Sequence, residues 1–236
     1  MGCATGKEKS QSQGAAPGGG KLRLLYFEGG YARADPIRFL LYHADIDFVD
    51  QSISTEAWAS RKKTENLAGE FGDLPILTSK GKQMGQAMAI LRSLGIKHGY
   101  YFPTDWKSAY YSDVIVDCWA DVFESMGKLL FLMQSAPEAE TRAAVDKAVD
   151  SVHEPMLQLI EKQLDDLGGP YIVGEKLTIA DFCCAAAFFN IWCNPAGPLK
   201  EVFGQVVARY PKSSAYKDRL GEMFKARLEA RAPLPF

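Results

Sequence analysis

Cysteine and histidine side chains supply many of the nucleophiles and metal ligands of proteins, and this chain has few of them. It contains five cysteines and three histidines. The cysteines show neither a paired spacing nor the spacing of a zinc site. We therefore expect no bound metal, and reduced thiols as in a cytoplasmic protein. The cysteines are Cys3, Cys118, Cys183, Cys184 and Cys193.

Tyr26 is another candidate for chemistry, because it stands near the end of a predicted strand. A tyrosine hydroxyl has a pKa of about 10, so near neutral pH it stays protonated and can donate a hydrogen bond into a cleft. The alternative is an ordinary strand tyrosine packed in the core. Taken alone, the residue pattern favours that alternative.

Composition limits the class of protein. The chain has 236 residues, 47% of them hydrophobic, which is enough for one large or two small domains with real cores. The formal net charge is -2 with both signs interspersed, which argues against a nucleic-acid-binding protein. No uncharged apolar run approaches about 18 residues, so no membrane-spanning helix is predicted. The N-terminus lacks the apolar core of a secretory signal.

The chain divides into segments of different composition. Residues 1–20 are rich in Gly, Ser, Gln and Ala and are expected to form a disordered tail. Residues 21–99 alternate strand and helix patterns, and residues 100–106 form the predicted linker. Residues 107–236 show helical periodicity, with breaks near Pro137, Gly168, Pro195 and Pro211.

The pattern in residues 21–99 predicts the order β-α-β-β-α. Strands are expected at 21–27 and 46–53, a helix at 34–44 and a closing helix at 86–95. A hairpin within 74–84 should turn at Lys80-Gly81. The helices carry an apolar face made of Ile37, Leu40, Leu41 and Ala44 in the first, and of Ile90, Leu91 and Leu94 in the second.

One helix of the C-terminal half has clear start signals. Gly168 and Gly169 can end the preceding helix, since glycine adopts the left-handed backbone at little cost. Thr178 and Asp181 have the spacing of a capping box, with Asp in the usual Glu or Gln place. The helix that follows, 179–192, is apolar on nearly every side and should run through the middle of a helical domain.

The segment from Gly168 to Phe182 closely resembles the core-helix signature of the cytosolic glutathione transferases. The resemblance extends over nearly all of the chain after residue 20. Other segments resemble family elements in the right order: Leu24-Leu25-Tyr26-Phe27, the strand-end LxYF element of the sigma class; Arg33-Ala34-Asp35 with Arg38; Trp58 with Lys62; residues 72–77; and Gln86-Ala87 at the family's Gln-Ser position.

This resemblance implies a fold of class α/β plus all-α. The N-terminal domain would be thioredoxin-like, with the order β-α-β-α-β-β-α, and a helical C-terminal domain would follow it. The N-terminal domain would bind glutathione. The helical domain would supply a hydrophobic substrate site and the contacts of a homodimer.

The implied reaction joins the thiolate of glutathione to a hydrophobic electrophile, as in detoxification. A free cysteine thiol has a pKa of about 8.5, and lowering it by two units takes about 2.7 kcal/mol of preferential stabilisation of the anion. A hydrogen bond to a charged group contributes roughly 1.5–3 kcal/mol. The resemblance assigns this hydrogen bond to Tyr26, with glutathione as co-substrate and no permanently bound cofactor.

The resemblance also implies which residues hold glutathione. The Leu74–Pro75 peptide is expected to be cis, with main-chain groups of Leu74 pairing with the cysteine of glutathione. Gln86 and Ala87 would begin a helix whose free amides bind the γ-glutamyl carboxylate. A trans proline at the start of an edge strand is the alternative for Pro75.

Further glutathione contacts are implied for Arg33, Trp58, Lys62 and Asp113. Trp58 and Lys62 would meet the glycyl end, through the indole N–H and the ammonium charge. Asp113, on the first long helix, would reach the glutathione of the partner subunit. The alternatives are solvated loop residues for Trp58 and Lys62, and a surface helix charge for Asp113.

Two positions depart from the family pattern. Ala87 replaces the family's serine, and loss of the hydroxyl should weaken γ-glutamyl binding by roughly 1–2 kcal/mol, or about tenfold. The loop Glu28-Gly29-Gly30-Tyr31 is one residue longer than expected. This extra residue is expected to place Arg33 differently.

Aromatic residues suggest where the electrophile binds. Trp119 and Phe123 lie beyond Asp113 on the long helix, and Tyr110 and Phe236 could close the pocket. An apolar pocket suits hydrophobic electrophiles. Such an aromatic stripe can equally belong to the core.

The start of the chain resembles that of acylated proteins, with Gly2 as a myristoylation site and Cys3 as a palmitoylation site. Two acyl chains would give stable residence at a membrane surface. Gly6 stands where the stricter pattern has Ser or Thr, and a solvated flexible arm is slightly favoured.

The sequence therefore predicts a cytoplasmic, homodimeric, sigma-like glutathione transferase that does not bind nucleic acid. Membrane association would depend on acylation of the tail. Two alternatives remain: a glutathione-dependent isomerase of the prostaglandin type or peroxidase on the same site, and a non-catalytic ligand-carrying or structural relative.

Overall fold

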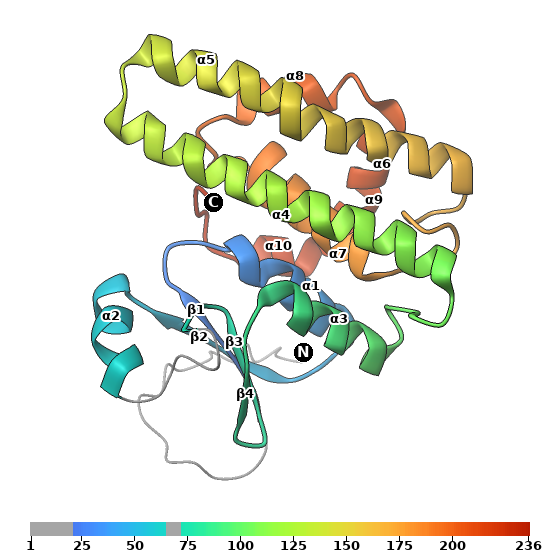
Figure 1. Ribbon diagram of the computed structural model, residues 1–236. Coiled ribbons are helices and arrows are strands. Elements are labelled where there is room, and N and C mark those ends of the chain that lie inside the picture. The colour runs from blue at the N-terminus through green and yellow to red at the C-terminus, as the bar shows by residue number, and fades with distance from the viewer. Residues whose placement is uncertain (1–20, 65–71) are drawn as a thin grey trace, which may run out of the picture.

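The computed structural model describes residues 21–64 and 72–236, and the predicted tail with its acylation sites Gly2 and Cys3 lies outside these residues (Figure 1). The strands are β1 Leu22–Phe27, β2 Phe48–Ile53, β3 Ile76–Ser79 and β4 Lys82–Met84. The helices of the N-terminal half are η1 Ala32–Ala34, α1 Asp35–His43, α2 Thr55–Thr64 and α3 Ala87–His98. Those of the C-terminal half are α4 Trp106–Ser135, α5 Glu138–Ala148, η2 Val149–His153, α6 Glu154–Leu167, α7 Ile179–Ala186, η3 Ala187–Trp192, α8 Lys200–Val207, α9 Pro211–Met223 and α10 Lys225–Ala230.

The N-terminal half is built on a four-stranded sheet of order β2-β1-β3-β4. β1 is parallel to β2 and antiparallel to β3, and β3 forms the predicted hairpin with β4. The two turn residues, Lys80 and Gly81, have φ of 48° and 80°, as a two-residue hairpin turn requires. This mixed order is the thioredoxin-like arrangement that the resemblance implied.

The helix α2 was absent from the order predicted by the residue pattern, β-α-β-β-α, and that prediction was wrong at this point. The observed order is β-α-β-α-β-β-α, as the resemblance implied. Helix α2 begins where the Ser54 hydroxyl accepts the Ala57 amide at 3.1 Å. Trp58 is its one buried residue among those whose side chains are described. A helix that buries so little apolar surface shows no 3.6-residue stripe.

Helices α1 and α3 lie between the sheet and the helical half (Figure 1). The predicted apolar face of α1 is confirmed: Ile37, Leu40 and Leu41 are fully buried, whereas Ala44 follows the last helical residue and is half-buried. Both α1 and α3 contact α7, so the core of the α/β half is continuous with that of the helical half.

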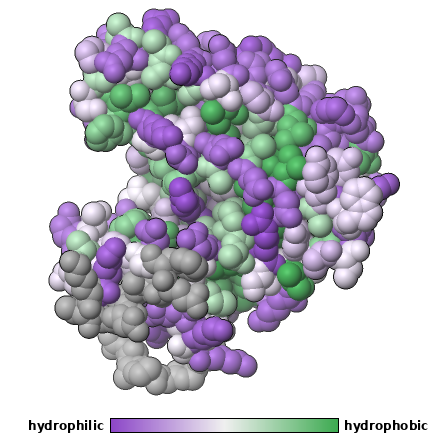
Figure 2. Space-filling view, viewed as in Figure 1, coloured by the Kyte–Doolittle hydropathy of each residue, from purple (hydrophilic) through white to green (hydrophobic). Residues whose placement is uncertain are grey.

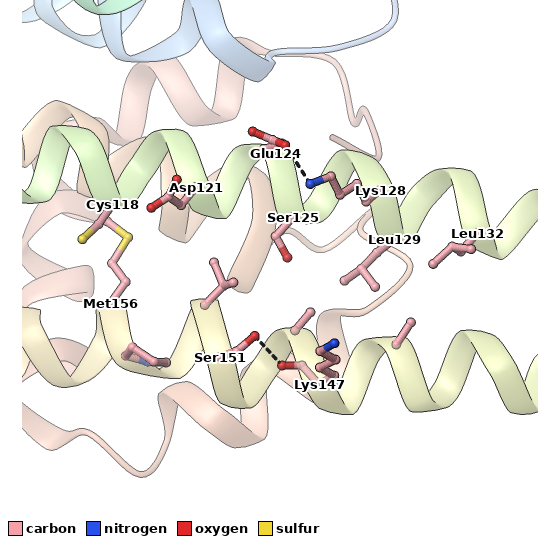
Figure 3. A pocket seen from close by; sticks show the side chains of 14 residues that line it. Cys118, Asp121, Glu124, Ser125, Lys128, Leu129, Leu132, Lys147, Ser151 and Met156 are labelled. Atoms are coloured by element: carbon pink, nitrogen blue, oxygen red, sulfur yellow. Dashed lines mark hydrogen bonds and ion pairs between the residues drawn. The ribbon is translucent and has the colours of Figure 1, made fainter.

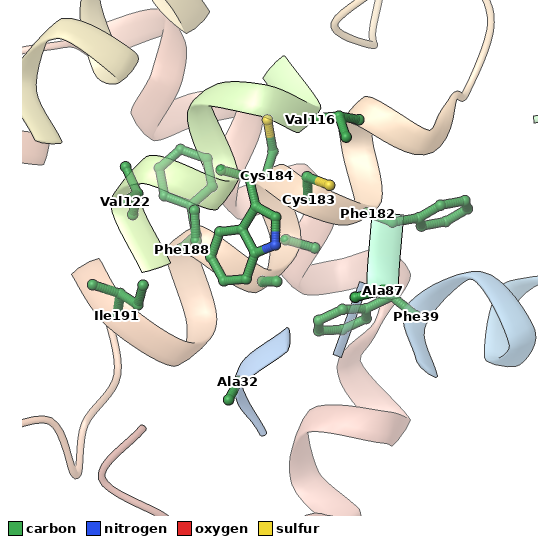
Figure 4. Close-up of a cluster of buried hydrophobic side chains, with 14 of the residues drawn as sticks. Ala32, Phe39, Ala87, Val116, Val122, Phe182, Cys183, Cys184, Phe188 and Ile191 are labelled. Atoms are coloured by element: carbon green, nitrogen blue, oxygen red, sulfur yellow. The ribbon is translucent and has the colours of Figure 1, made fainter. Parts of the chain in front are cut away.

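Helix α7 occupies the centre of the helical half, as predicted, and every residue of it is buried (Figure 4). The capping box forms, and the Thr178 amide donates to the Asp181 carboxylate at 2.7 Å. The predicted helix 179–192 continues from α7 as the π-helical segment η3, which the apolar pattern does not distinguish from an α-helix. Gly168 and Gly169 end α6 with φ of 64° and 82°.

Four cysteines, Cys118, Cys183, Cys184 and Cys193, are free thiols. Burial raises the pKa of Cys183 and Cys184 well above the usual value, so these two thiols stay protonated. In the part of the chain that the structure describes, no helix is both long and apolar enough to cross a membrane.

Candidate active site

Tyr26 lies near the end of β1, with its ring buried except for 6% of its surface. Its hydroxyl oxygen accepts the amide N–H of Arg33 at 3.4 Å, and no described residue accepts its proton. Burial raises the pKa of Tyr26; the Arg33 amide and the positive charges of Arg33 and Arg38 act in the opposite direction. The phenol is therefore protonated near neutral pH and can act as a donor.

The loop between β1 and α1 brings the main chain of Arg33, rather than its guanidinium, to Tyr26. Gly29 has φ of 81° and Ala32 has φ of 40°. These left-handed residues let the chain, with its extra residue, turn back over the end of β1. The Arg33 guanidinium instead lies 4.7 Å from the centre of the Phe123 ring.

Gln86 has a strained backbone at the start of α3. Its φ is 66°, in the left-handed region that residues with a side chain seldom adopt. Such strain persists only where the surroundings hold it, and it is concentrated at functional sites. Ala87, the first residue of α3, is buried, and Gln86 and Ala87 both line a small cavity. The first amides of a helix have no intrahelical acceptor.

That cavity, of about 350 Å³, is lined by some of the residues that the sequence assigned to glutathione and by some of those assigned to the electrophile. Predicted residues that are not among its lining include Tyr26, Trp58, Lys62, Leu74 and Pro75. Gln86, Ala87 and Arg33 come from the α/β half, and Trp119 and Phe123 from α4. The Phe236 ring stacks on Phe123 with their centres 5.1 Å apart. The space-filling view shows the molecule hollowed between its two halves, on the side that α4 overhangs (Figure 2).

Trp58 and Lys62 are neighbours on α2. The Lys62 ammonium lies 5.7 Å from the Trp58 ring centre and donates to the carbonyl of Gly72 at 3.2 Å. Trp58 is buried against Phe27, whose ring in turn contacts Tyr26. Trp58 and Lys62 are thus connected to Tyr26 through the ring of Phe27.

The Leu74–Pro75 peptide is cis, as predicted. Leu74 is buried just before β3, which pairs with the Tyr26 strand. The alternative of a trans proline opening an edge strand is excluded.

The structure does not bring Tyr110 to this cavity. Its side chain is 59% exposed, and its ring contacts Tyr111. It precedes Phe123 on the same straight helix by 13 positions, or about 20 Å. Trp119 and Phe123 line the cavity, and Tyr110 is not among its lining residues.

Asp113 is held by its own chain. One carboxylate oxygen accepts Arg92 Nε at 2.8 Å and the other accepts the Tyr101 hydroxyl at 2.6 Å. Arg92 also lines the cavity and bonds Asp117 at 3.1 Å. The sequence analysis missed Arg92, because a lone arginine on a predicted helix carries no signal of its partners.

A larger cavity, of about 680 Å³, lies between α4 and the α5–α6 helix pair (Figure 3). Cys118, Leu129 and Met156 line it, together with the Glu124–Lys128 ion pair on one edge. It contains none of the predicted catalytic, glutathione or electrophile residues. Size alone therefore does not identify the active site, and the smaller cavity beside Arg33 and Gln86 is the better candidate.

Comparison with known proteins agrees with this geometry. The model of the glutathione S-transferase C-terminal domain family matches residues 120–224. Glutathione S-transferase 4 of Caenorhabditis elegans is 32% identical over 164 residues, which cover 69% of this chain and 76% of that protein. The chain belongs to the glutathione transferase family.

Solved structures share the fold at lower identity. A Nu-class transferase from Haemonchus contortus superposes with a TM-score of 0.76 at 24% identity, over 92% of this chain and 100% of that one. A sigma-class transferase from Fasciola hepatica superposes with a TM-score of 0.75 at 23% identity, over 92% and 99%. Because two classes fit equally well, the fold does not decide the class.

Proposed function

We propose that Tyr26 is the residue with which this glutathione transferase holds the thiolate of glutathione for conjugation to hydrophobic electrophiles. The observation that carries the proposal is the position of the Tyr26 hydroxyl. It accepts the Arg33 amide, and Arg33 lines the cavity where the predicted glutathione and electrophile residues meet. A phenol that accepts one hydrogen bond becomes a stronger donor in another, because bonded dipoles polarise each other.

The size of this effect is sufficient for the chemistry. A hydrogen bond to a charged group contributes about 1.5–3 kcal/mol, which lowers a thiol pKa by about one to two units. Starting from a thiol pKa of about 8.5, this makes thiolate a substantial fraction at neutral pH. The raised pKa of Tyr26 keeps the phenol from ionising in competition with the thiol.

For glutathione itself, the proposed contacts follow the three parts of the tripeptide. The amides of Gln86 and Ala87 at the start of α3 bind the γ-glutamyl carboxylate, with weaker affinity because Ala87 has no hydroxyl. Main-chain groups of Leu74, before Pro75, pair with the cysteine. Trp58, Lys62 and Arg33 bind the glycyl end and the cavity edge.

The proposed assembly is a cytoplasmic homodimer in which Asp113 of the partner subunit completes the glutathione site. Arg92 and Tyr101 would then orient the carboxylate that reaches across. Residues 21–99 would bind glutathione, and residues 107–236 would supply dimer contacts and the electrophile pocket of Trp119, Phe123 and Phe236. The Leu24–Phe27 element supports a sigma-like class.

Tyr26→Phe tests the proposal in a standard conjugation assay. Loss of one hydrogen bond to a charged sulfur should lower kcat/KM at neutral pH by about tenfold or more and raise the pKa of the bound thiol. The matched control is Tyr42→Phe, since Tyr42 is an exposed tyrosine of α1 outside the cavity.

Three results would count against the proposal. An unchanged rate in Tyr26→Phe would assign the hydrogen bond to another donor. Glutathione returned or oxidised, rather than consumed, would indicate isomerase or peroxidase chemistry. Glutathione binding without any turnover would indicate a carrier protein.

A further inference from the structure

A buried ion cluster joins the end of the described chain to the start of α1. Asp35 is fully buried, and its carboxylate accepts Arg227 Nη2 at 2.6 Å, Asn190 Nδ2 at 2.9 Å and Arg231 Nη1 at 3.4 Å. A buried carboxylate is costly unless it is paired. Arg38 Nη1 also lies 3.9 Å from this carboxylate, so three arginines surround its charge. The shorter bond is that of Arg227.

Arg231 has contacts that this pairing does not explain. Its guanidinium donates to the Asn190 side-chain oxygen at 2.7 Å and to the Phe189 carbonyl at 2.6 Å, both in the π-helical segment η3. The guanidinium carbon, Cζ, lies over the Tyr31 ring, 4.6 Å from its centre. Arg227 has no such contact with the loop; it lies over Phe39 instead. Arg231 is thus fixed at one end and presents a flat surface to Tyr31.

Tyr31 is tied to the segment 232–236 as well. Its hydroxyl donates to the carbonyl of Ala232 at 2.5 Å, and its amide donates to the main-chain oxygen of Phe236 at 2.8 Å. The carbonyl of Leu234 is held by Asn194 at 2.9 Å, so the segment is anchored in the helical half. These bonds attach the β1–α1 loop to residues that follow it by about 200 positions.

The conformation of this loop depends on such attachments. Ala32, next to Tyr31, has φ of 40°, which a residue with a Cβ adopts only where the surrounding structure enforces it. The next residue, Arg33, donates its amide to Tyr26 at 3.4 Å, near the outer limit of a hydrogen bond. A displacement of a few tenths of an ångström would lose that bond.

We propose that Arg231 is a positioning residue for thiolate formation, acting through Tyr31 to hold the Arg33 amide on the Tyr26 hydroxyl. This inference rests on the proposed function of Tyr26. Arg231 is not among the residues that line the candidate cavity, so it would act only through other residues. Its effect is to keep the phenol polarised and therefore a stronger donor to sulfur.

The test is the pKa of the thiol of bound glutathione, followed by the ultraviolet absorbance of the thiolate across pH. Arg231→Ala should raise this pKa by about half a unit to one unit, which is about a three- to tenfold smaller acid dissociation constant of the thiol. The pH profile of kcat/KM should shift by the same amount. Arg227→Ala is the matched control, because it removes the shorter bond to the same carboxylate without touching Tyr31.

If the Arg231→Ala variant does not fold, Tyr31→Ala provides the test instead. It removes the ring under Arg231 and the bond to Ala232 but leaves every bond to Asp35 in place, and it should raise the thiol pKa by a similar amount. Equal shifts in Arg231→Ala and Arg227→Ala would overturn the proposal and leave only a structural ion cluster. So would an unshifted thiol pKa in either Arg231→Ala or Tyr31→Ala. A wild-type protein that does not lower the thiol pKa would refute the role of Tyr26 itself, and this inference with it.

Discussion

His153 should make the folded protein lose stability as the pH falls from 6.5 to about 4. The residue ends the π-helical segment η2 and is fully buried. The Trp192 indole N–H donates to Nδ1 of His153 at 3.0 Å, so Nδ1 carries no proton. The Ser125 hydroxyl lies 3.2 Å from Nε2 of the same ring. Protonation would place two N–H groups against each other. Burial lowers the pKa of His153 from 6.5 to about 4.

The sign and size follow from proton linkage. Below pH 6.5 the unfolded chain binds a proton at His153, whereas the folded protein does not bind it until the pH reaches about 4. Stability therefore falls over this window and the loss levels off below it. Between about pH 7 and about pH 5 the loss from this one group is about 2 kcal/mol, at 1.36 kcal/mol per pKa unit. This is a large share of the roughly 5–15 kcal/mol that stabilises a typical domain.

The assay is urea-induced unfolding of wild type and His153→Gln at both pH values. The glutamine side-chain oxygen can still accept the Trp192 N–H, so the variant loses the titration more than the packing. Protein concentration is varied, because the stability of the proposed dimer depends on it. His98→Gln, at a partly buried histidine on α3, is the control and should keep most of the wild-type pH dependence. If His153→Gln lost as much stability between the two pH values as wild type, the linkage argument would be wrong.

Two further predictions concern the packing around α7. Asp181→Ala should lower stability in thermal unfolding by several kcal/mol, because each buried donor that it leaves without an acceptor costs about 1–3 kcal/mol. Tyr216→Phe removes just one of these donors and should cost about 1–2 kcal/mol. Similar losses in the two variants would refute this reasoning. Gly169→Ala should destabilise the protein by clearly more than Gly168→Ala. A Cβ at Gly169 would lie 2.6 Å from main-chain atoms of Gly174, whereas one at Gly168 meets nothing within 4 Å. Gly168→Ala therefore carries only the cost, of about 1–3 kcal/mol, of a backbone with φ of 64° and ψ of -177°, which residues other than glycine rarely adopt. Equal losses in Tm would contradict the steric reasoning.

The elements that the sequence predicted well are those specified by neighbouring residues. The turn at Lys80-Gly81, the capping box of Thr178 and Asp181, and the glycines after α6 each depend on a few consecutive residues. Local backbone preference and the side chain that satisfies it are visible together in such segments. The apolar face of α1 was predictable for the same reason, because its period matches its own helix.

The missed features depend on residues far apart in the chain. Helix α2 has little apolar surface to bury, so its packing leaves no stripe. Asp35 and Arg231 are 196 positions apart, and no periodicity links them. The sequence also did not indicate that Arg92 and Tyr101 would donate hydrogen bonds to the two carboxylate oxygens of Asp113 within one chain. Tyr110 and Phe123 share a helix, but their distance along it separates them.

The same division runs through the candidate active site. The groups proposed to act on glutathione are specified by local sequence: a phenol near the end of β1 and amides at the start of α3. The placement of those groups is not local, since the amide that bonds Tyr26 belongs to a loop in which Tyr31, next to the left-handed Ala32, contacts residues 231–236. A chain can therefore keep the scaffold of this family at low identity while changing how strongly it ionises glutathione. Changes at the far end of the helical half would alter the thiol pKa without altering any residue that touches the tripeptide.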